Sequence, residues 1–335
     1  MKIIDLGEDA ARAAAAMRRL GEEARRAEAR VAALKGSLVW ITSKGADYLV
    51  RAAWDGRRRR QTSLGRRGPE TEAAKAAFDR DRTEARIHAR AVEAEIARSA
   101  RIARAHGLGR VPVAAARVIR ALEAEGLFEH GWRIGGPTAL LAYEAAAGGT
   151  CVGETEAERA FLDEAKRRLV LIATTDPGRA LLDRLRRVDR GFRPVAGGFA
   201  NGQGFSIEIV GQAGERAASS SVRAEALGWV RRSRVFTAEA FDAKGVPVRL
   251  SAPDPRVLAG ADLMLAGDLF RDPVLRPGDD LRGAATVGLL GRGIVGGEAS
   301  AGLPRAMPRE AVAALTAALG GRGRSSSFVH GSSAS

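Results

Sequence analysis

The sequence predicts an α+β fold with three parts: an N-terminal helical hairpin with a small antiparallel β-meander, a central mixed sheet with flanking helices, and a C-terminal α/β extension. Three observations lead to this prediction. Long runs rich in Ala, Glu and Arg flank residues 36–65, where short apolar segments alternate with turn residues. Two glycines, Gly135 and Gly136, separate a short apolar lead from an apolar helix-like run. Strand-like segments follow at 169–173 and 205–210.

The length bounds the number of units. A chain of 335 residues is too long for one small core, and 45% hydrophobic residues suffice to bury a substantial one. Shifts in composition divide the chain into a hairpin over 1–107, a core over 108–215, a C-terminal region over 216–319 and a tail over 320–335. The tail is expected to be disordered.

The charge balance is strongly basic. The chain has 54 Lys and Arg against 40 Asp and Glu, which gives a formal net charge of +14. A positive field of this size favours phosphate-bearing partners without naming one. A basic protein without such a partner would have the same composition, so both interpretations stay open.

Cysteine, histidine and hydropathy exclude several classes of protein. Cys151 is the only cysteine, so an intrachain disulfide and a cysteine-based zinc site are impossible. The four histidines are scattered, which argues against a His-rich metal site and a Ser-His-Asp triad. The start has no signal-peptide core, and no apolar stretch approaches the length of a membrane span. We therefore expect a cytoplasmic protein without membrane contact.

The first elements form the hairpin and the meander. Apolar residues recur at helical spacing over 8–34, and Gly36 ends that helix. Three strand-like runs form the meander: 38–41, 48–51 and 60–64. Pro69 then opens a long helix that extends to about His106. The two helices are expected to pack antiparallel and to carry the meander at one end.

The meander is a candidate nucleic-acid interface. Four arginines follow one another at its tip: Arg57, Arg58, Arg59 and Arg60. Trp40, Tyr48 and Trp54 lie on the same strands, and aromatic residues among basic ones suit stacking on bases combined with pairing to phosphates of RNA or DNA. The alternative is that the aromatic residues pack the small sheet onto the helices, since three strands need an apolar anchor.

The central and C-terminal elements follow from periodicity and turn signals. A helix over 114–125 precedes the glycine turn, a buried strand covers 169–173, and Pro177 opens an amphipathic helix. Asn201-Gly202 is the expected turn of a hairpin that ends at Val210. Further along, Lys244-Gly245 marks another turn. A helix starts at Pro253-Asp254-Pro255, and a last helix covers 308–319.

Residues with chemical potential gather around the glycine turn. Gly135 and Gly136 allow a backbone to approach a phosphate, and the helix after them offers unpaired N–H groups. Glu156 and Glu158 follow, and alternation over 205–210 places Glu208 opposite the apolar face. Three carboxylates can hold two Mg²⁺ ions beside a triphosphate. An enzyme that transfers nucleotidyl groups has this order of parts.

Each of these glutamates also has a structural interpretation. Thr155-x-x-Glu158 matches a capping box, in which Glu158 caps a helix and contacts no metal. Glu208 can be a glutamate on an exposed sheet face. Both interpretations stay open at this stage.

The same region resembles a known family. Residues 135–148 read GGPTALLAYEAAAG, which is similar to the first core motif of a bacterial nucleotidyltransferase-fold family in the DNA polymerase β superfamily. Further blocks resemble that family in order, and together they cover most of residues 36–285. The resemblance implies binding of an NTP with Mg²⁺ and transfer of a nucleotidyl group to a hydroxyl on RNA, protein or a small molecule.

The chain departs from the family pattern at several positions. The family has a strand motif Asp-x-Asp shortly after the glycine turn, and this part of the chain contains none. One alignment places the two aspartates at Glu158 and Ala160, and a shifted alignment places them at Glu156 and Glu158. Pro137 replaces a small hydroxyl residue, and proline has no N–H to offer a phosphate.

The resemblance also implies which residues bind the nucleotide. Gly135, Gly136 and Thr138 would contact the phosphates, and Arg256 and Arg276 would approach the nucleotide unless they are merely solvated. Two functions follow as alternatives. The chain is an active nucleotidyltransferase, or it keeps the fold as an inactive protein that binds nucleic acid or regulates a partner protein.

Overall fold

The chain forms two compact units in the computed structural model, which describes residues 1–54, 58–174, 178–211, 221–268, 279–295, 303 and 307–323. Unit 1 contains residues 1–14 and 103–335, and unit 2 contains residues 15–102. Helices alternate with mixed and antiparallel sheets, so the predicted α+β class is confirmed.

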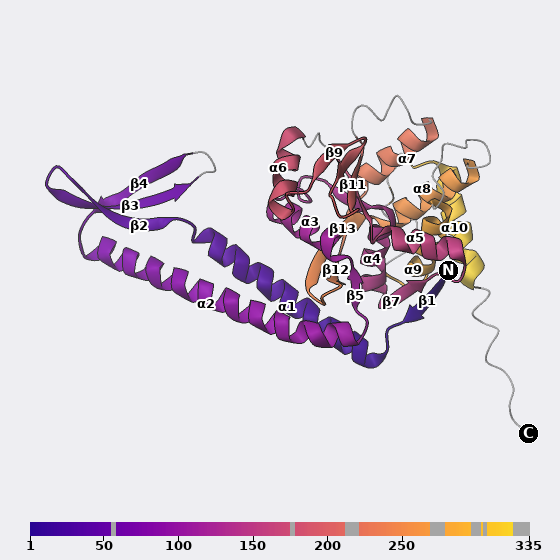
Figure 1. Ribbon diagram of the computed structural model, residues 1–335, viewed down its shortest axis with the longest axis horizontal. Helices are drawn as coiled ribbons and strands as arrows, with labels where there is room; N and C mark the ends of the chain where they lie inside the picture. Colours follow the sequence, from indigo (N-terminus) through magenta and orange to yellow (C-terminus); the bar gives the residue numbers. More distant parts are fainter. Residues whose placement is uncertain are drawn as a thin grey trace, which may run out of the picture. The chain divides into compact units, whose positions relative to one another are not determined.

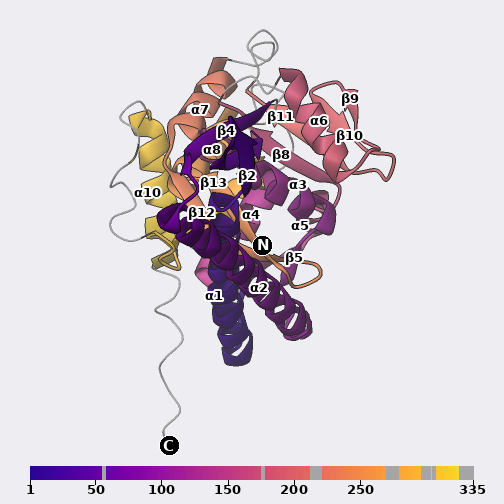
Figure 2. The same cartoon turned by 90° about the vertical axis from the view of Figure 1, so that its left-hand side faces the viewer.

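Unit 2 is the predicted hairpin with its meander. Its elements are α1 (Glu8–Ala33, whose first turns belong to unit 1), β2 (Ser37–Ser43), β3 (Ala46–Trp54), β4 (Arg59–Arg66) and α2 (Pro69–Ala105, whose end belongs to unit 1). The two helices run side by side in both views (Figures 1 and 2). The strands pair antiparallel in the order β2-β3-β4. Leu49 is fully buried and anchors the small sheet, as three strands require.

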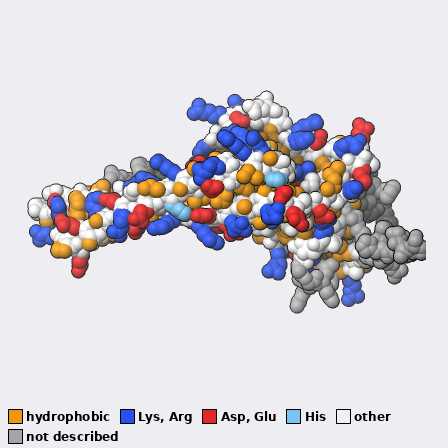
Figure 3. Space-filling view, turned by 90° about the horizontal axis from the view of Figure 1, so that it is seen from below, with side chains coloured by type: hydrophobic (Ala, Val, Ile, Leu, Met, Phe, Trp, Pro, Cys, Tyr) orange, Lys and Arg blue, Asp and Glu red, His pale blue; other side chains and the backbone are white. Residues whose placement is uncertain are grey.

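Some arginine and aromatic residues of unit 2 contact other residues of the same unit. The Arg67 guanidinium lies 5.2 Å from the centroid of the Trp40 ring, and Arg67 also pairs with Asp47 and Glu72. Arg58 and Arg60 are exposed, whereas Arg57 and the side chains of Trp54 and Arg59 lie outside the described residues. Charges of both signs intersperse along the face of unit 2 in Figure 3. Nucleic-acid binding by this sheet stays a prediction.

A mixed five-stranded sheet forms the centre of unit 1. Its order is β6-β8-β11-β10-β9, with β6 (Arg133–Gly135), β8 (Arg168–Ile172), β11 (Ser206–Val210), β10 (Gly198–Ala200) and β9 (Arg193–Val195). The strands β8 and β11 pair parallel, and the other neighbours pair antiparallel. This is the predicted central mixed sheet.

The two faces of this sheet differ in kind. Leu169, Leu171, Ile207 and Ile209 are at most 2% exposed on one face, as the alternation predicts. The other face of β8 and β11 presents residues 168, 170, 172, 206, 208 and 210. Helix α4 (Gly136–Ala147) leaves the sheet at the glycine turn, and all its residues from 136 to 144 are buried. Its apolar run is therefore that of a core helix.

A second sheet joins regions that the sequence analysis separated. The strands β13 (Pro247–Pro253), β12 (Val235–Asp242) and β5 (Gly109–Val111) pair in that order, and β5 runs parallel to β12. The predicted boundary at 215/216 therefore does not separate compact units. Similarly, β1 (Lys2–Asp5) pairs with β7 (Gly149–Val152), so residues 1–14 belong to unit 1 and not to the predicted 1–107 unit.

Helices complete unit 1. They are α3 (Val113–Ala124), α5 (Glu156–Glu164), α6 (Gly178–Val188), α7 (Ser221–Arg232), α8 (Pro255–Asp268), α9 (Asp279–Leu290) and α10 (Arg309–Gly323). The last helix includes residues 320–323, which the sequence analysis assigned to the tail, and 324–335 lie outside the described residues. Within the described ranges, no helix has the length and apolarity that crossing a membrane requires.

Candidate functional site

The glycine turn joins β6 to α4 and needs glycine for two reasons. Gly136 has φ +59°, in the left-handed region that side chains rarely adopt. A Cβ at this position would lie 2.7 Å from Cγ2 of Val170. The turn is therefore packed directly onto strand β8. Pro137 follows within the first turn of α4, where its missing N–H breaks no helical hydrogen bond.

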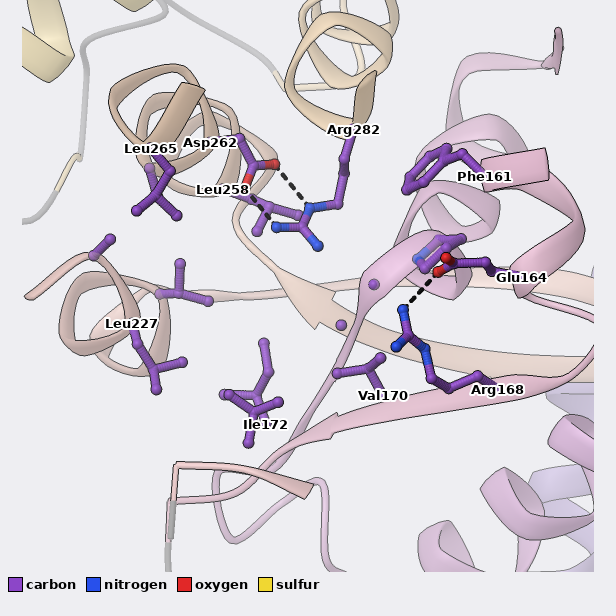
Figure 4. A pocket seen from close by; sticks show the side chains of 17 residues that line it. Phe161, Glu164, Arg168, Val170, Ile172, Leu227, Leu258, Asp262, Leu265 and Arg282 are labelled. Carbon is purple, nitrogen blue, oxygen red and sulfur yellow. Dashed lines mark hydrogen bonds and ion pairs between the residues drawn. The ribbon is translucent and has the colours of Figure 1, made fainter. Parts of the chain in front are cut away.

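A pocket of about 810 Å³, counted to its open mouth, lies at this turn. Figure 4 shows how its side chains converge from the sheet and from the surrounding helices. Most of the lining is apolar, and four charged side chains interrupt it. The lining residues are Gly135, Gly136, Pro137, Phe161, Glu164, Arg168, Val170, Ile172, Val210, Ala226, Leu227, Val230, Leu258, Ala261, Asp262, Leu265 and Arg282. A pocket of this kind suits a ligand with an apolar ring and a polar end.

Two ion pairs form the polar part of the pocket. Arg168 donates to Glu164 at 2.5 Å and lies 3.4 Å from Glu208. Arg282 makes a bidentate pair with Asp262, with N–O distances of 2.6 and 2.8 Å. Asp262 is only 1% exposed, and Figure 4 shows the two pairs separated by the pocket. The two cations and two anions of the lining balance each other.

Strand pairing places these residues in rows across the sheet. Gly135 pairs with Val170, which pairs with Glu208, and this row lies under the glycine turn. Arg168 stands two residues before Val170 on the same face. The strand that adjoins the glycine turn therefore presents Arg, Val and Ile to the pocket. None of these three side chains is a carboxylate.

The three predicted metal ligands do not meet. Glu156 is exposed at the start of α5. The Glu158 carboxylate accepts hydrogen bonds within the capping box at the N-terminus of α5, and Glu208 pairs with Arg168. No group of three or more His, Cys, Asp and Glu side chains within the described part of the chain can hold a metal ion. Both alignments of the Asp-x-Asp motif fall on a helix and not on a strand. These residues do not fit a pair of Mg²⁺ ions, which demand near-octahedral oxygen sites.

Glu158 has the structural role that the capping box indicates. Thr155 Oγ1 accepts from the Glu158 N–H at 3.2 Å. The Glu158 carboxylate accepts from the N–H groups of Thr155 and Glu154, at 3.1 and 2.8 Å, and from the Met1 ammonium. The hydrogen bond from Met1, followed by those from Thr155 and Glu154, lowers the pKa of Glu158 from 4.5 to about 2. Of the two interpretations left open for Glu158, the structure supports the cap.

We expect Glu158 to make the stability of unit 1 depend on acid. Its folded pKa is depressed, so its contribution is complete above the ordinary pKa of 4.5 and is lost as the pH falls towards 2. The free energy of urea unfolding, measured between pH 5 and pH 2.5, should fall less steeply for Glu158→Gln than for the wild type. Glu156→Gln, on the same first turn but exposed, is the matched control. Equal slopes for the wild type and Glu158→Gln would contradict this role.

Some of the predicted nucleotide-binding residues line the pocket, and others do not. Gly135 and Gly136 line the pocket, as expected for the turn. Thr138 is fully buried, its hydroxyl has no hydrogen-bond partner, and it is absent from the lining. Arg256 is 5% exposed and donates to both oxygens of Asp254, at 3.0 and 2.6 Å. This arginine forms a buried ion pair with Asp254, the residue that immediately precedes α8. Arg276 lies outside the described residues.

Arg168 and Arg282 line the pocket, and neither was predicted from the sequence. A signal existed for Arg168. It immediately precedes the apolar run 169–173, and period-two alternation places it on the face of Val170 and Ile172. No comparable signal existed for Arg282, because it enters the pocket from α9, more than a hundred residues from the glycine turn.

Comparison with known proteins adds one match. A family model described as "Nucleotidyltransferase" matches residues 114–292, more than half of the chain. The match includes the glycine turn, the central sheet and every lining residue of the pocket. No curated protein and no solved structure matches the chain.

Proposed function

Since this chain belongs to the nucleotidyltransferase family whose model it matches, we propose that the pocket at the glycine turn binds a nucleotide without a metal ion. Arg168 contacts the phosphates in place of the metal. The observation that carries this proposal is the row of side chains under the turn. At that place a metal site needs carboxylates, and β8 instead presents Arg168 and Val170, with Arg168 held by Glu164 and Glu208.

The guanidinium of Arg168 has donors to spare for a phosphate. Its Nη atoms contact the two glutamates, whereas its Nε is buried without a hydrogen-bond partner. A guanidinium presents five N–H donors in a planar fork that matches phosphate oxygens. The carboxylates keep the side chain extended over the sheet, so little rotamer entropy remains to be lost on binding. A bound phosphate would replace Glu164 as an acceptor of hydrogen bonds from this guanidinium.

The apolar part of the lining suits the base. Phe161 provides an aromatic ring, and Leu227 and Leu258 enter from the helices α7 and α8 (Figure 4). Stacking and apolar burial at such a surface tolerate different bases, so we expect similar affinities for ATP and GTP. Metal-dependent transfer of a nucleotidyl group requires a donor set for the ions, and these residues lack one. We therefore propose binding without transfer, and transfer to a hydroxyl acceptor is the alternative.

Isothermal titration with ATP tests this proposal. Removing Mg²⁺ with EDTA should change the dissociation constant by less than about threefold, because no carboxylate set depends on the ion. Arg168→Ala should weaken binding roughly 10- to 100-fold, since a hydrogen bond to a charged group contributes about 1.5–3 kcal/mol. Arg167→Ala is the matched control, because Arg167 is the adjacent arginine and is exposed.

Two outcomes would overturn the proposal. ATP that binds only with Mg²⁺, or binds equally well to Arg168→Ala, would show that the arginine does not replace a metal. Incorporation of radiolabelled nucleotide into an acceptor would establish transfer. The double variant Arg168→Asp/Val170→Asp places two carboxylates beside Glu208, and its ATP binding should become dependent on Mg²⁺.

A further inference from the structure

Arg133 is a buried cation to which the described part of the chain offers no countercharge. It is 6% exposed, and its Nη1 donates a hydrogen bond to the carbonyl oxygen of Trp132 at 2.9 Å. Its Nε has no partner, and no carboxylate among the described residues pairs with its guanidinium. Burial alone accounts for the lowered pKa of Arg133. A buried ionised group in this state is costly to the fold unless something pairs with it.

The other buried arginines of unit 1 show what is missing at Arg133. Arg256 is 5% exposed and pairs with both oxygens of Asp254. Arg282, which is 16% exposed at its side chain, pairs in the same bidentate way with Asp262. Each of these guanidinium groups meets the planar pair of oxygens that its geometry fits. Arg133 has the same fork, and none of the described residues supplies such a pair of oxygens to it.

Strand pairing places Arg133 on the face of the sheet that lines the pocket. Arg133 is two residues before Gly135 on β6, and it pairs with Ile172 in the antiparallel ladder to β8. Directly paired residues share a face of the sheet, and so do residues two apart on one strand. Gly135 and Ile172 both line the pocket. Arg133 therefore lies on the face of the sheet that lines the pocket. Its pair with Ile172 is the next pair along the ladder from Gly135 and Val170 on this face.

Arg133 and Arg168 occupy opposite ends of this face. Arg168 is four residues before Ile172 along β8, which corresponds to roughly 13 Å of strand. The two arginines therefore start from separate rows of the sheet, and an anion at each is treated as a separate group.

We propose that Arg133 binds an oxyanion of the phosphate class at a second subsite, which adjoins the pocket because Arg133 shares a sheet face with the lining residues Gly135 and Ile172. The proposal rests on the proposed function, because the nucleotide phosphates are assigned to Arg168. The oxyanion supplies the pair of oxygens that no described residue offers to this guanidinium. A second phosphate-bearing ligand, or a phosphate on the ribose end of the nucleotide, has this chemistry.

Thermal unfolding of the full chain tests the second subsite with inorganic phosphate as the probe. In chloride buffer without phosphate, Arg133→Met should raise the Tm, because the variant removes an uncompensated buried charge. Phosphate at millimolar concentration should raise the Tm of the wild type, and the variant should lose at least tenfold in phosphate affinity. Arg133→Lys retains the charge without the planar fork, so an intermediate phosphate response is expected. Arg167→Met is the exposed control and should change neither quantity.

The outcomes separate this inference from the proposed function. A lower Tm for Arg133→Met with an unchanged phosphate response would overturn the subsite and leave Arg133 a packing residue. No phosphate response in the wild type would overturn it as well. Adding phosphate to protein saturated with ATP distinguishes the sources: a persisting response indicates a separate ligand, and a lost response indicates a phosphate of the nucleotide. Absence of ATP binding to the wild type contradicts the proposed function alone.

Discussion

Replacing Asp254 with alanine is expected to lower the free energy of unfolding by about 3–5 kcal/mol, because it removes one partner of a buried ion pair. Asp254 and Arg256 are each 5% exposed, and two hydrogen bonds join their side chains. Asp254 also accepts from the Arg256 N–H at 3.0 Å, at the start of α8. Urea unfolding at pH 7 measures the loss.

The matched control for this prediction is an exposed ion pair. Glu95 pairs with Arg98 on α2, and both side chains are exposed by more than a third. Glu95→Ala should change the unfolding free energy far less than Asp254→Ala, because solvent screens an exposed pair. The double variant Asp254→Leu/Arg256→Met removes both charges and should recover most of the loss, since apolar replacements of buried pairs are often neutral. Equal losses for Asp254→Ala and Glu95→Ala would mean that Asp254 is not the partner Arg256 needs.

Gly136→Ala is expected to destabilise unit 1 by about 2–5 kcal/mol and to abolish nucleotide binding. Left-handed backbone costs a residue with a Cβ about 1–2 kcal/mol, and overpacking a core adds about 1–3 kcal/mol. Both terms act here, because φ is +59° and the new Cβ would lie 2.7 Å from Val170. The turn would have to move away from β8, and the floor of the pocket would move with it. Urea unfolding and ATP titration measure the two effects.

A variant at Gly148 distinguishes the cost of the left-handed backbone from the cost of the steric clash with Val170. It ends the same helix with φ +62°, and a Cβ there would meet no atom within 4 Å. Gly148→Ala should therefore cost only the left-handed term, about 1–2 kcal/mol, and should keep ATP binding. Gly136→Ala/Val170→Ala removes most of the clash and should be closer in stability to Gly148→Ala. A Gly136→Ala loss no larger than that of Gly148→Ala would mean that the packing of the turn onto Val170 is unimportant.

Much of the fold could be predicted because its signals are local. The hairpin helices, the meander and the strand of Leu169 and Leu171 each show a period within a few residues. The capping box was visible as Thr155 and Glu158 and formed as such. Gly135 and Gly136 marked the turn, and the turn lines the pocket. Each of these features depends on hydrogen bonds or alternation between near neighbours.

The prediction of the metal and nucleotide site was wrong where it required residues far apart in the sequence to lie together. Glu158 had two interpretations, and its own neighbours supplied enough donors for the capping one. The Asp-x-Asp alignments placed the motif within residues 156–160, but α5 occupies that stretch, and the strand that pairs with β6 comes later, at Arg168. Arg256 was expected to approach the nucleotide, but its guanidinium pairs with Asp254, two residues earlier in the chain. In each case a nearer partner satisfied the group.

By itself the sequence determined the classes of element and the turn, since periodicity, capping and glycine geometry act over a few residues. Only the tertiary structure decided which side chains face one another. Strand β8 brings Arg168 to Glu208, α9 brings Arg282 to Asp262, and β6 places Arg133 in a row with Ile172. These encounters follow from strand register and helix packing between segments far apart in the chain, and one residue of register reverses which face a side chain occupies.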